Sequence, residues 1–377
     1  MRNEYDVIVI GGGIIGFSVA YYLCRANQSV LLIEKNFPGS GSTGRCITGI
    51  RAQFSTEASI RLAMESIELF KSMEDEFGFS VEWYPSGYLF LAYDEARKNS
   101  FLQNLAVQQH AGLDVRFMEK KDIQKLVPIM NCDSLLGGTF CPTDGQADPF
   151  RVLKGYHQGM KKLGGKILVH SEVIAIEIRG DGQKAVFTGT GETFVAPKIV
   201  NAAGPWAREV GNMVGNDLPV APERHEALIT EGVQPMYLPM LVDYRADGCY
   251  FIQRLSGQFI GCYTPQPPVP GKDLGTTFEF LTEMPRRMIR LVPVLENIAV
   301  IRQWAGSYSM TPDGNPIVDE TDIPGVYVCV GMCGHGFMLG PALGKALAHF
   351  IVRDSWSLDM HEFKFGRSFD SKAESLK

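Results

Sequence analysis

Residues 6–16 read DVIVIGGGIIG, and this stretch decides the fold. Its first half is a short β-branched run, which predicts a buried parallel strand over residues 6–10. Three glycines follow at once, and a helical spacing of apolar residues then runs over residues 15–25. A second apolar strand is expected at residues 28–33, and it ends in Glu34. A strand, a glycine turn, a helix and another parallel strand are typical of a Rossmann-like α/β domain.

The spacing Gly11-x-Gly13-x-x-Gly16 is a dinucleotide fingerprint, because it lies between strand and helix with an acid about 20 residues further on. The first glycine permits the tight turn, the second lets a pyrophosphate approach, and the third lets helix and strand pack closely. The helix N-terminus favours phosphate charge, and Glu34 is expected to bind ribose hydroxyls. FAD and NAD share this fingerprint. The residues predicted to hold the nucleotide here are Gly11, Gly13, Ile14, Ile15, Gly16, Glu34 and Lys35.

Three later segments are expected to join the same site. Residues 38–43, PGSGST, offer small hydroxyl side chains for a second phosphate contact, and the loop then runs on under a ring system. Residues 198–207, KIVNAAGPWA, read as strand, turn and helix, so the nucleotide domain is discontinuous. Residues 165–173 read as a strand whose end sets backbone against an adenine ring. The cofactor contacts predicted in these segments are Ser42, Thr43, Arg45, Cys46, Thr48, Gly49, Val173, Ala202, Ala203, Gly204 and Trp206.

The composition is that of a soluble globular protein large enough for two domains: 377 residues, 45% hydrophobic and 21% charged. The formal net charge of −6 argues against a nucleic-acid surface. The 8 cysteines are scattered, which predicts reduced thiols and no metal site. Glycines interrupt the apolar stretch 7–24, so no membrane span or signal is expected. A cytoplasmic location is predicted, with any membrane association made through a partner or electron acceptor.

With these patterns the chain resembles the D-amino-acid oxidase superfamily of FAD-dependent amine oxidoreductases. It is most similar to the group of sarcosine oxidase β-subunits and dye-linked L-proline dehydrogenase β-subunits. The resemblance covers nearly the whole chain and is carried by VIVIGGGIIG (7–16), GSGSTGRCITGIR (39–51), PTDGQADP (142–149), NAAGPWA (201–207), TPDGNPIV (311–318) and GHGFMLGP (334–341).

The resemblance implies an α/β fold with two domains. A discontinuous Rossmann-like FAD-binding domain is expected over residues 1–82, 143–216 and 312–377. A substrate domain with a mixed sheet is expected over residues 83–142 and 217–311. Strand-like segments at 87–93, 226–230, 249–253, 258–263 and 300–304, with helical stretches near 58–77 and 94–111, fit this division.

The resemblance also implies hydride transfer to FAD from a carbon beside an amine nitrogen. Monomeric sarcosine oxidases attach FAD through a cysteine at the position of Gly306, so noncovalent FAD is expected. Their oxygen-activating lysine falls on Phe259, which favours a dehydrogenase unless another lysine takes that role. Heterotetrameric relatives bind FMN through a histidine near the position of Asp148, and none stands here before His157. FMN at an interface with an α-type subunit would therefore be noncovalent.

The familiar anchors for a substrate carboxylate are missing. The arginine of glycine oxidases falls on Tyr308, and the lysine of monomeric sarcosine oxidase falls on Met338. Arg51 is then the best remaining cation and Arg302 the second choice, because a guanidinium binds a carboxylate bidentately. A structural ion pair is the alternative role for Arg51. Tyr308 is expected to pack on a ring or N-methyl group, and His225 is either an electron-transfer or FMN contact or a structural histidine.

The stretch GMCGHGFMLGP, residues 331–341, is a second glycine loop. A strand is expected before it over residues 322–330 and a helix after it from about Pro341. Backbone N–H groups of this loop should face the flavin edge where negative charge develops on reduction. The residues predicted to meet the flavin here are Gly334, His335, Gly336, Phe337 and Met338.

The preferred function is the catalytic subunit of an amine or imino-acid dehydrogenase acting on proline, hydroxyproline, sarcosine or an opine. A stand-alone oxidase that produces hydrogen peroxide stays open, as does a non-catalytic flavin-binding subunit. A 2-hydroxy-acid dehydrogenase is a further alternative, with His335 as general base. The candidate catalytic residues are Arg51, Tyr308, His335 and His225.

Overall fold

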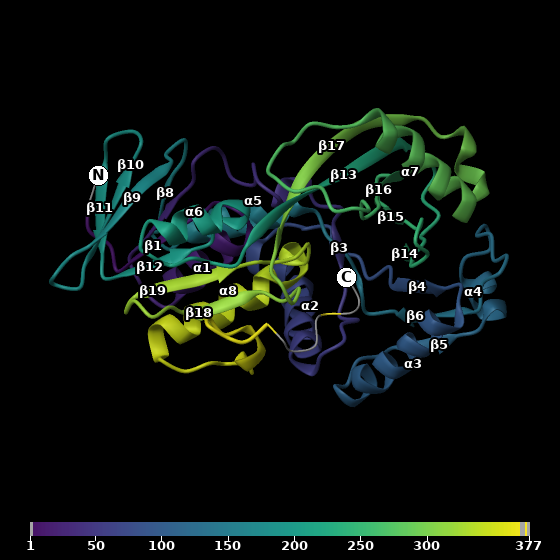
Figure 1. Cartoon of the computed structure of the whole chain (residues 1–377), viewed down its shortest axis with the longest axis horizontal. Helices are drawn as coiled ribbons and strands as arrows, with labels where there is room; N and C mark the ends of the chain where they lie inside the picture. The colour runs from purple at the N-terminus through teal and green to yellow at the C-terminus, as the bar shows by residue number, and fades with distance from the viewer. Residues whose placement is uncertain (1–2, 370–373, 375–377) are drawn as a thin grey trace.

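The computed structural model describes residues 3–369 and residue 374, and two large sheets stand side by side in it (Figure 1). The first is six-stranded and parallel except for one antiparallel strand at its edge. In order across the sheet the strands are β18 (Ile317–Glu320), β19 (Val326–Val330), β12 (Lys198–Asn201), β1 (Val7–Ile10), β2 (Val30–Ile33) and β8 (Lys166–Leu168).

Strand β1 is buried on both faces, which explains its unbroken apolar sequence. Val7 and Val9 join a core formed with the helices α1 (Ile14–Arg25), α2 (Glu57–Phe77), α5 (Pro149–Lys162) and α8 (Gly336–Arg353). Ile8 and Ile10 join a second core, against the three-stranded sheet of β11 (Thr193–Ala196), β10 (Lys184–Thr188) and β9 (Val173–Ile178). Helices on one face and a small sheet on the other make the predicted Rossmann-like arrangement, which is thereby confirmed.

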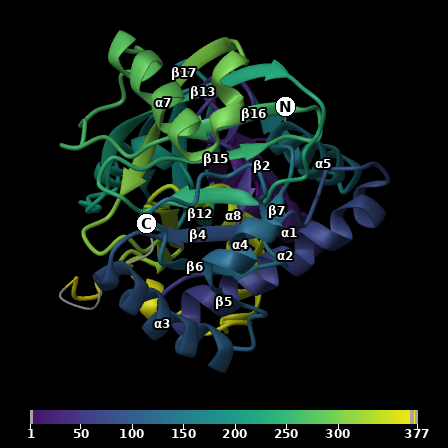
Figure 2. The same ribbon diagram turned by 90° about the vertical axis from the view of Figure 1, so that its right-hand side faces the viewer.

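The second sheet is eight-stranded and mixed, since β4 and β14 pair in parallel and the other neighbours are antiparallel. In order its strands are β17 (Val300–Met310), β13 (Ala221–Gly232), β16 (Gln258–Cys262), β15 (Tyr250–Gln253), β14 (Met240–Asp243), β4 (Tyr88–Ala92), β6 (Gly137–Cys141) and β5 (Arg116–Met118). Helices α4 (Lys120–Leu126) and α7 (Phe278–Leu291) cover its outer face, which is turned to the viewer in Figure 2. The other face turns toward the first sheet.

Smaller elements complete the chain. Helix α3 (Glu95–His110) packs beside β4 through Phe101, and the short pair β3 (Gly49–Ile50) and β7 (Gly145–Gln146) joins two loops between the large sheets. Helix α6 (Ala207–Asn212) follows β12. Within residues 3–369, we find no helix that combines the length and the apolar character needed to cross a membrane.

The two sheets draw their strands from separate parts of the chain. The six-stranded sheet uses three stretches, within residues 7–33, 166–201 and 317–330, and the eight-stranded sheet uses two, within 88–141 and 221–310. This pattern supports the proposed discontinuous division into two domains. The proposed limits at residues 1–2 and 370–377 lie, apart from residue 374, outside the described residues.

Three predicted boundaries in and beside the first sheet were wrong. The expected strand 165–173 is two strands, because β8 ends at Leu168 and the chain turns through His170, at φ 54°, before β9 begins. The strand expected at 322–330 starts only at Val326, after a turn at Gly325 with φ 78°.

The helix expected from Pro341 begins instead at Gly336, with the proline inside it. Close packing of α8 on α1 outweighs the proline's poor fit to a helix interior. A Cβ added at Gly344 would lie 2.1 Å from Ser18 Oγ, and one added at Gly340 would lie 2.8 Å from Ile14 Cγ1.

Candidate cofactor and substrate site

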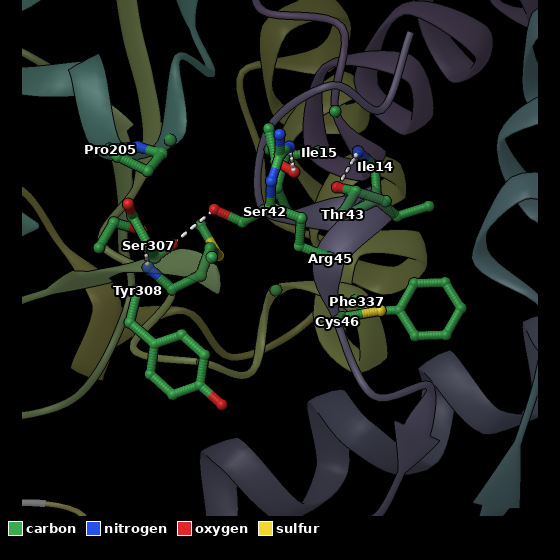
Figure 3. A pocket seen from close by; sticks show the side chains of 18 of the residues that line it. Ile14, Ile15, Ser42, Thr43, Arg45, Cys46, Pro205, Ser307, Tyr308 and Phe337 are labelled. Carbon is green, nitrogen blue, oxygen red and sulfur yellow. Dashed lines mark hydrogen bonds between the residues drawn. The ribbon is translucent and has the colours of Figure 1, made fainter. Parts of the chain in front are cut away.

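A cavity of about 410 Å³ runs from the carboxyl ends of the parallel strands to the inner face of the eight-stranded sheet. Figure 3 shows part of its lining, which comes from segments far apart in sequence. Ser42 Oγ donates a 2.6 Å hydrogen bond to the Ser307 carbonyl of β17 and so links the two sides. The residues predicted to meet cofactor or substrate line this cavity, except Gly16 and the second-choice cation Arg302. A Cβ at Gly16 would lie 1.9 Å from the Gly11 carbonyl oxygen, so that glycine serves helix packing.

At one end of the cavity the backbone forms a glycine cradle. Gly11 has φ 117°, and a Cβ there would lie 2.4 Å from the Ala202 carbonyl oxygen, so only glycine fits. The Ile14 N–H of α1 donates a 3.0 Å bond to Thr43 Oγ1, as Figure 3 shows. Glu34 Oε2 accepts a 2.7 Å bond from the Gly12 N–H. These contacts fix the turn in front of the helix N-terminus, where a phosphate group is favoured.

Next to this cradle, two lysines lie close to the ring of Trp206. Lys35 Nζ lies 3.3 Å from the centre of the indole ring and Lys272 Nζ lies 5.6 Å from it. Lys272 also forms an ion pair with Glu209. Burial lowers the pKa of both lysines. Lys272 comes from a loop of the eight-stranded sheet, and no motif marked it in the sequence.

At the other end, one wall of the cavity is aromatic and uncharged. The Tyr308 ring stacks on His225 with 3.9 Å between centroids and 17° between planes. The Tyr308 and Tyr250 hydroxyls are 3.2 Å apart, and the Tyr250 hydroxyl donates a 3.2 Å bond to Cys262 Sγ. Burial lowers the pKa of His225 to about 4, raises that of Cys262 to about 12 and raises those of both tyrosines. All four side chains are therefore neutral near pH 7.

Arg51 faces this wall as a buried cation, with only 5% of its surface exposed. Its Nη2 lies 3.0 Å from His335 Nε2, and its Nη1 donates to the Gln53 carbonyl. The guanidinium carbon lies 4.2 Å from the centre of the Phe54 ring and 5.5 Å from that of Phe90. Because arginine only donates, His335 Nε2 must accept this bond, and the imidazole is neutral in this arrangement.

The loop that carries Arg51 is held from behind by a buried carboxyl group. Asp144 accepts a 2.8 Å bond from the Ala52 N–H and a 3.1 Å bond from the Gln53 amide. Burial raises the pKa of Asp144 to about 6, against the lowering effect of these hydrogen bonds. These hydrogen bonds give a structural role to Asp144, the first of the two aspartates in PTDGQADP (142–149), to which the sequence analysis had assigned none.

Sequence analysis missed further aromatic and apolar residues at this end of the cavity. Strand β4 brings Tyr88 and Phe90 to the cavity, and β14 brings Met240 and Val242, with Tyr244 just after it. The nearly continuous apolar sequences of these strands could have indicated burial on both faces, but not what either face encloses.

Two sequence predictions about this end of the cavity were wrong. Arg302, the second choice for the carboxylate, is exposed on β17 and does not line the cavity. Phe259 points away from the cavity into the outer core, with its ring 6.1 Å from that of Phe251. It therefore gives no information about oxygen. Within the described residues, the lysine that lines the cavity is Lys35, which lies at the far end beside Trp206.

A family model of FAD dependent oxidoreductases, DAO, matches residues 6–350. The chain belongs to the DAO family. A crystal structure of L-proline dehydrogenase from P. horikoshii shares 33% identity, with a TM-score of 0.92 over 97% of both chains. The sarcosine oxidase subunit beta of Rhizobium meliloti (strain 1021) is 28% identical over 97% of this chain and 89% of its own.

Mitochondrial dimethylglycine dehydrogenase of Rattus norvegicus is 29% identical to this DAO-family chain over 96% of the chain. The match spans only 44% of that enzyme, so this chain corresponds to less than half of it. The chain also aligns with glycine oxidase from Geobacillus kaustophilus at 24% identity and a TM-score of 0.89, a likeness of fold.

The cavity of this DAO-family protein fits FAD, the cofactor of the family. The glycine cradle and helix N-terminus suit its phosphates, and the residues beside them suit its nucleotide end. No group of three or more His, Cys, Asp or Glu side chains within residues 3–369 is placed to hold a metal ion.

Proposed function

We propose that this chain is the catalytic, β-type subunit of a dehydrogenase that oxidises a secondary amine or imino acid carrying one carboxylate. Noncovalently bound FAD would accept a hydride from the carbon next to the amine nitrogen. The observation that carries the proposal is Arg51, a buried cation that faces an otherwise neutral, aromatic wall. Arg51 would hold the carboxylate, and the wall would pack on a ring or an N-methyl group.

The aromatic end of the cavity favours a neutral amine over an ammonium ion. Its tyrosines and His225 carry no negative charge near pH 7, because burial disfavours their charged forms. Glu226 lines the cavity, but its carboxylate accepts bonds from the Thr277 N–H and hydroxyl and from Gln303 Nε2. A cyclic or N-alkylated amino acid of the proline or sarcosine type fits these walls best, because its ring or N-methyl group would pack on the aromatic side chains.

The alternative of a 2-hydroxy-acid dehydrogenase is weaker in this geometry. That reaction needs a general base for the substrate hydroxyl, and His335 was the candidate. Its Nε2 instead accepts a hydrogen bond from Arg51 at 3.0 Å, which makes His335 a positioning residue for the cation.

We further propose that electrons pass to a partner rather than directly to oxygen. Support comes from the 28% identity with a protein named sarcosine oxidase subunit beta, a name that implies further subunits. Support also comes from the position of Lys35, the lysine among the described lining residues. It lies beside Trp206, at the end opposite the aromatic wall, so it would not supply the cation that activates oxygen in oxidases. A noncovalent FMN at the interface with an α-type subunit is part of this proposal, and so is a cytoplasmic location.

The test is anaerobic mixing of the FAD-loaded protein with L- and D-proline, hydroxyproline, sarcosine, an opine and a 2-hydroxy acid. The expected result is bleaching of the flavin absorbance by a proline- or sarcosine-type compound only. Air should restore the absorbance slowly and a dye quickly. Bleaching by the 2-hydroxy acid alone would contradict the substrate proposal, and fast reoxidation by air would contradict the electron-acceptor proposal.

A further inference from the structure

Glu374 places a buried carboxylate beside the loop that carries Arg51. Only 2% of the Glu374 surface is exposed. Its Oε2 accepts a 3.1 Å hydrogen bond from the Ser55 N–H, and its own N–H donates a 3.1 Å bond to the Asp313 carbonyl, in the loop before β18. Burial of a carboxylate is costly unless it is hydrogen-bonded, so these contacts determine where the side chain lies.

The start of α2 explains why an acidic side chain is accommodated here. Ser55 stands just ahead of Thr56, the N-cap residue of α2, whose hydroxyl oxygen accepts a bond from the Ser59 N–H. The N-terminus of a helix carries partial positive charge, and α2 is 21 residues long. A carboxylate bound to the N–H just ahead of the cap is therefore favoured, which offsets part of the cost of burying Glu374.

The peptide group that Glu374 binds lies next to the proposed substrate cation. Phe54 precedes Ser55, and its ring lies 4.2 Å from the Arg51 guanidinium carbon and 5.1 Å from the centre of the His335 ring. The Phe54 carbonyl accepts a 2.9 Å bond from Gln108 Nε2 of α3. Side chains from outside the loop thus hold both polar groups of this one peptide, the carbonyl and the N–H, and the orientation of the peptide fixes the direction of the Phe54 ring.

The charge of Glu374 also reaches the lining of the cavity. Tyr244 lines the aromatic end, and burial raises the pKa of its hydroxyl to about 12. The charges of Arg51 and Arg97 oppose this rise, and the charge of Glu374 adds to it. Since Arg51 and Glu374 act on the same hydroxyl with opposite signs, both groups belong to the surroundings of the proposed substrate.

We propose that Glu374 is a positioning residue for the substrate cation. Its carboxylate fixes the peptide between Phe54 and Ser55, and the Phe54 ring then sets the plane in which the Arg51 guanidinium meets a substrate carboxylate. Asp144 holds the same loop nearer its start, so two acidic residues from distant parts of the chain hold it at two points. The inference rests on the proposed role of Arg51 in binding the substrate.

The experiment compares Glu374→Ala, Glu374→Asp and Glu374→Gln in the FAD-loaded protein. Alanine removes the acceptor, aspartate keeps the charge but shortens the reach, and glutamine keeps an acceptor oxygen without the charge. The probe is cyclopentanecarboxylate, which has a ring and a carboxylate but no amine to be oxidised. Its dissociation constant is measured from the change in flavin absorbance, and the dissociation constant of FAD is measured in parallel. Arg51→Lys and Glu296→Ala, at an exposed glutamate, are the reference variants.

Glu374→Ala and Glu374→Asp should each weaken binding of the probe about tenfold, the effect of one lost hydrogen bond to a charged group. Glu374→Gln should bind the probe nearly as well as the wild type does, because the Ser55 N–H keeps an acceptor. Glu296→Ala should also match the wild type. The dissociation constant of FAD should be the same in all three Glu374 variants, since the contact lies away from the nucleotide.

Wild-type affinity for the probe in both Glu374→Ala and Glu374→Asp, together with weak binding in Arg51→Lys, would overturn the role of Glu374 and leave the substrate site standing. Unchanged affinity in Arg51→Lys would refute the proposed carboxylate site itself, and the role of Glu374 with it. Equal losses of affinity for the probe and for FAD in Glu374→Ala would show a general structural role and would also overturn the inference. If Glu374→Ala does not fold, the aspartate and glutamine variants still decide.

Discussion

Replacement of Arg51 by lysine tests the centre of the proposed site. The guanidinium now donates to the Gln53 carbonyl and to His335 Nε2 while it lies 4.2 Å over the Phe54 ring. These contacts fix the plane of the group, which sets the orientation in which a guanidinium would meet a carboxylate. Lysine keeps the charge but has no planar fork, and it cannot satisfy the same acceptors and bind bidentately at once.

The expected loss is that of one charged hydrogen bond, about 1.5–3 kcal/mol. Since each 1.4 kcal/mol is a factor of ten, the substrate KM should rise about 10- to 150-fold in Arg51→Lys. The rate of flavin reduction at saturating substrate should change much less, because the carboxylate is bound in the ground state as well as in the transition state.

The assay is anaerobic stopped-flow reduction of the flavin over a range of concentrations of the substrate identified by the panel. Arg302→Lys is the matched control, because Arg302 is an exposed arginine outside the cavity. If Arg51→Lys and Arg302→Lys gave KM values within a factor of two of the wild type, Arg51 would not hold the carboxylate. The structural ion-pair role would then replace the proposed one.

Three further results are expected. His335→Leu should raise KM about tenfold with little change in kcat, because Arg51 loses the acceptor that positions it. His335→Gln should largely restore the wild-type KM, since an amide oxygen can accept a hydrogen bond from Arg51. Equal KM values in the two variants would contradict the positioning role. Lys272→Met should speed FAD release about fivefold in a fluorescence assay, because Lys272 holds two cavity-lining residues, Glu209 through an ion pair and Trp206 through a cation–π contact, which together contribute about 1 kcal/mol; an unchanged release rate would show that Lys272 does not support the cofactor site. The pKa of His225 falls from 6.5 to about 4 on folding, so between these pH values the unfolded chain binds the extra proton and acidification destabilises the fold. In this window the free energy of unfolding of the FAD-free protein, measured with urea, should fall by about 1.4 kcal/mol for each pH unit of acidification relative to that of His225→Gln. The same pH dependence of unfolding in both proteins would contradict this expectation.

The nucleotide half of the site could be predicted from the sequence because its chemistry is local. Gly11 and Glu34 lie within a single βαβ unit, so their roles follow from spacing along the chain. The second glycine loop was found for the same reason, although its helix begins earlier than expected. Close packing of α8 on α1 decided that boundary, and packing between distant segments leaves no local pattern.

The substrate half could be predicted only in part, because several strands of one sheet assemble it. Arg51 and Tyr308 were found through resemblance, yet nothing in the sequence indicated that Tyr88, Phe90 or Tyr244 would face them. The errors at Arg302 and Phe259 have a common physical cause: the cavity meets only one end of each strand, since the lining begins at Gly306 on β17 and is reached at Cys262 on β16. Sequence motifs located these strands but could not fix where along them the cavity lies.

The charge distribution at the aromatic end of the cavity would allow Arg51 alone to hold the proposed carboxylate. Two unit charges 4 Å apart attract by about 1 kcal/mol in water but by about 4 kcal/mol at the effective dielectric constant of 20 found near protein groups. Neutral walls, such as the stacked pair of His225 and Tyr308, keep the dielectric low and add no competing charge. Burial of a guanidinium is costly, and the Gln53 carbonyl, His335 and the Phe54 ring offset part of that cost before substrate arrives. The same walls would disfavour a protonated amine, and a neutral amine is the form that can give up a hydride.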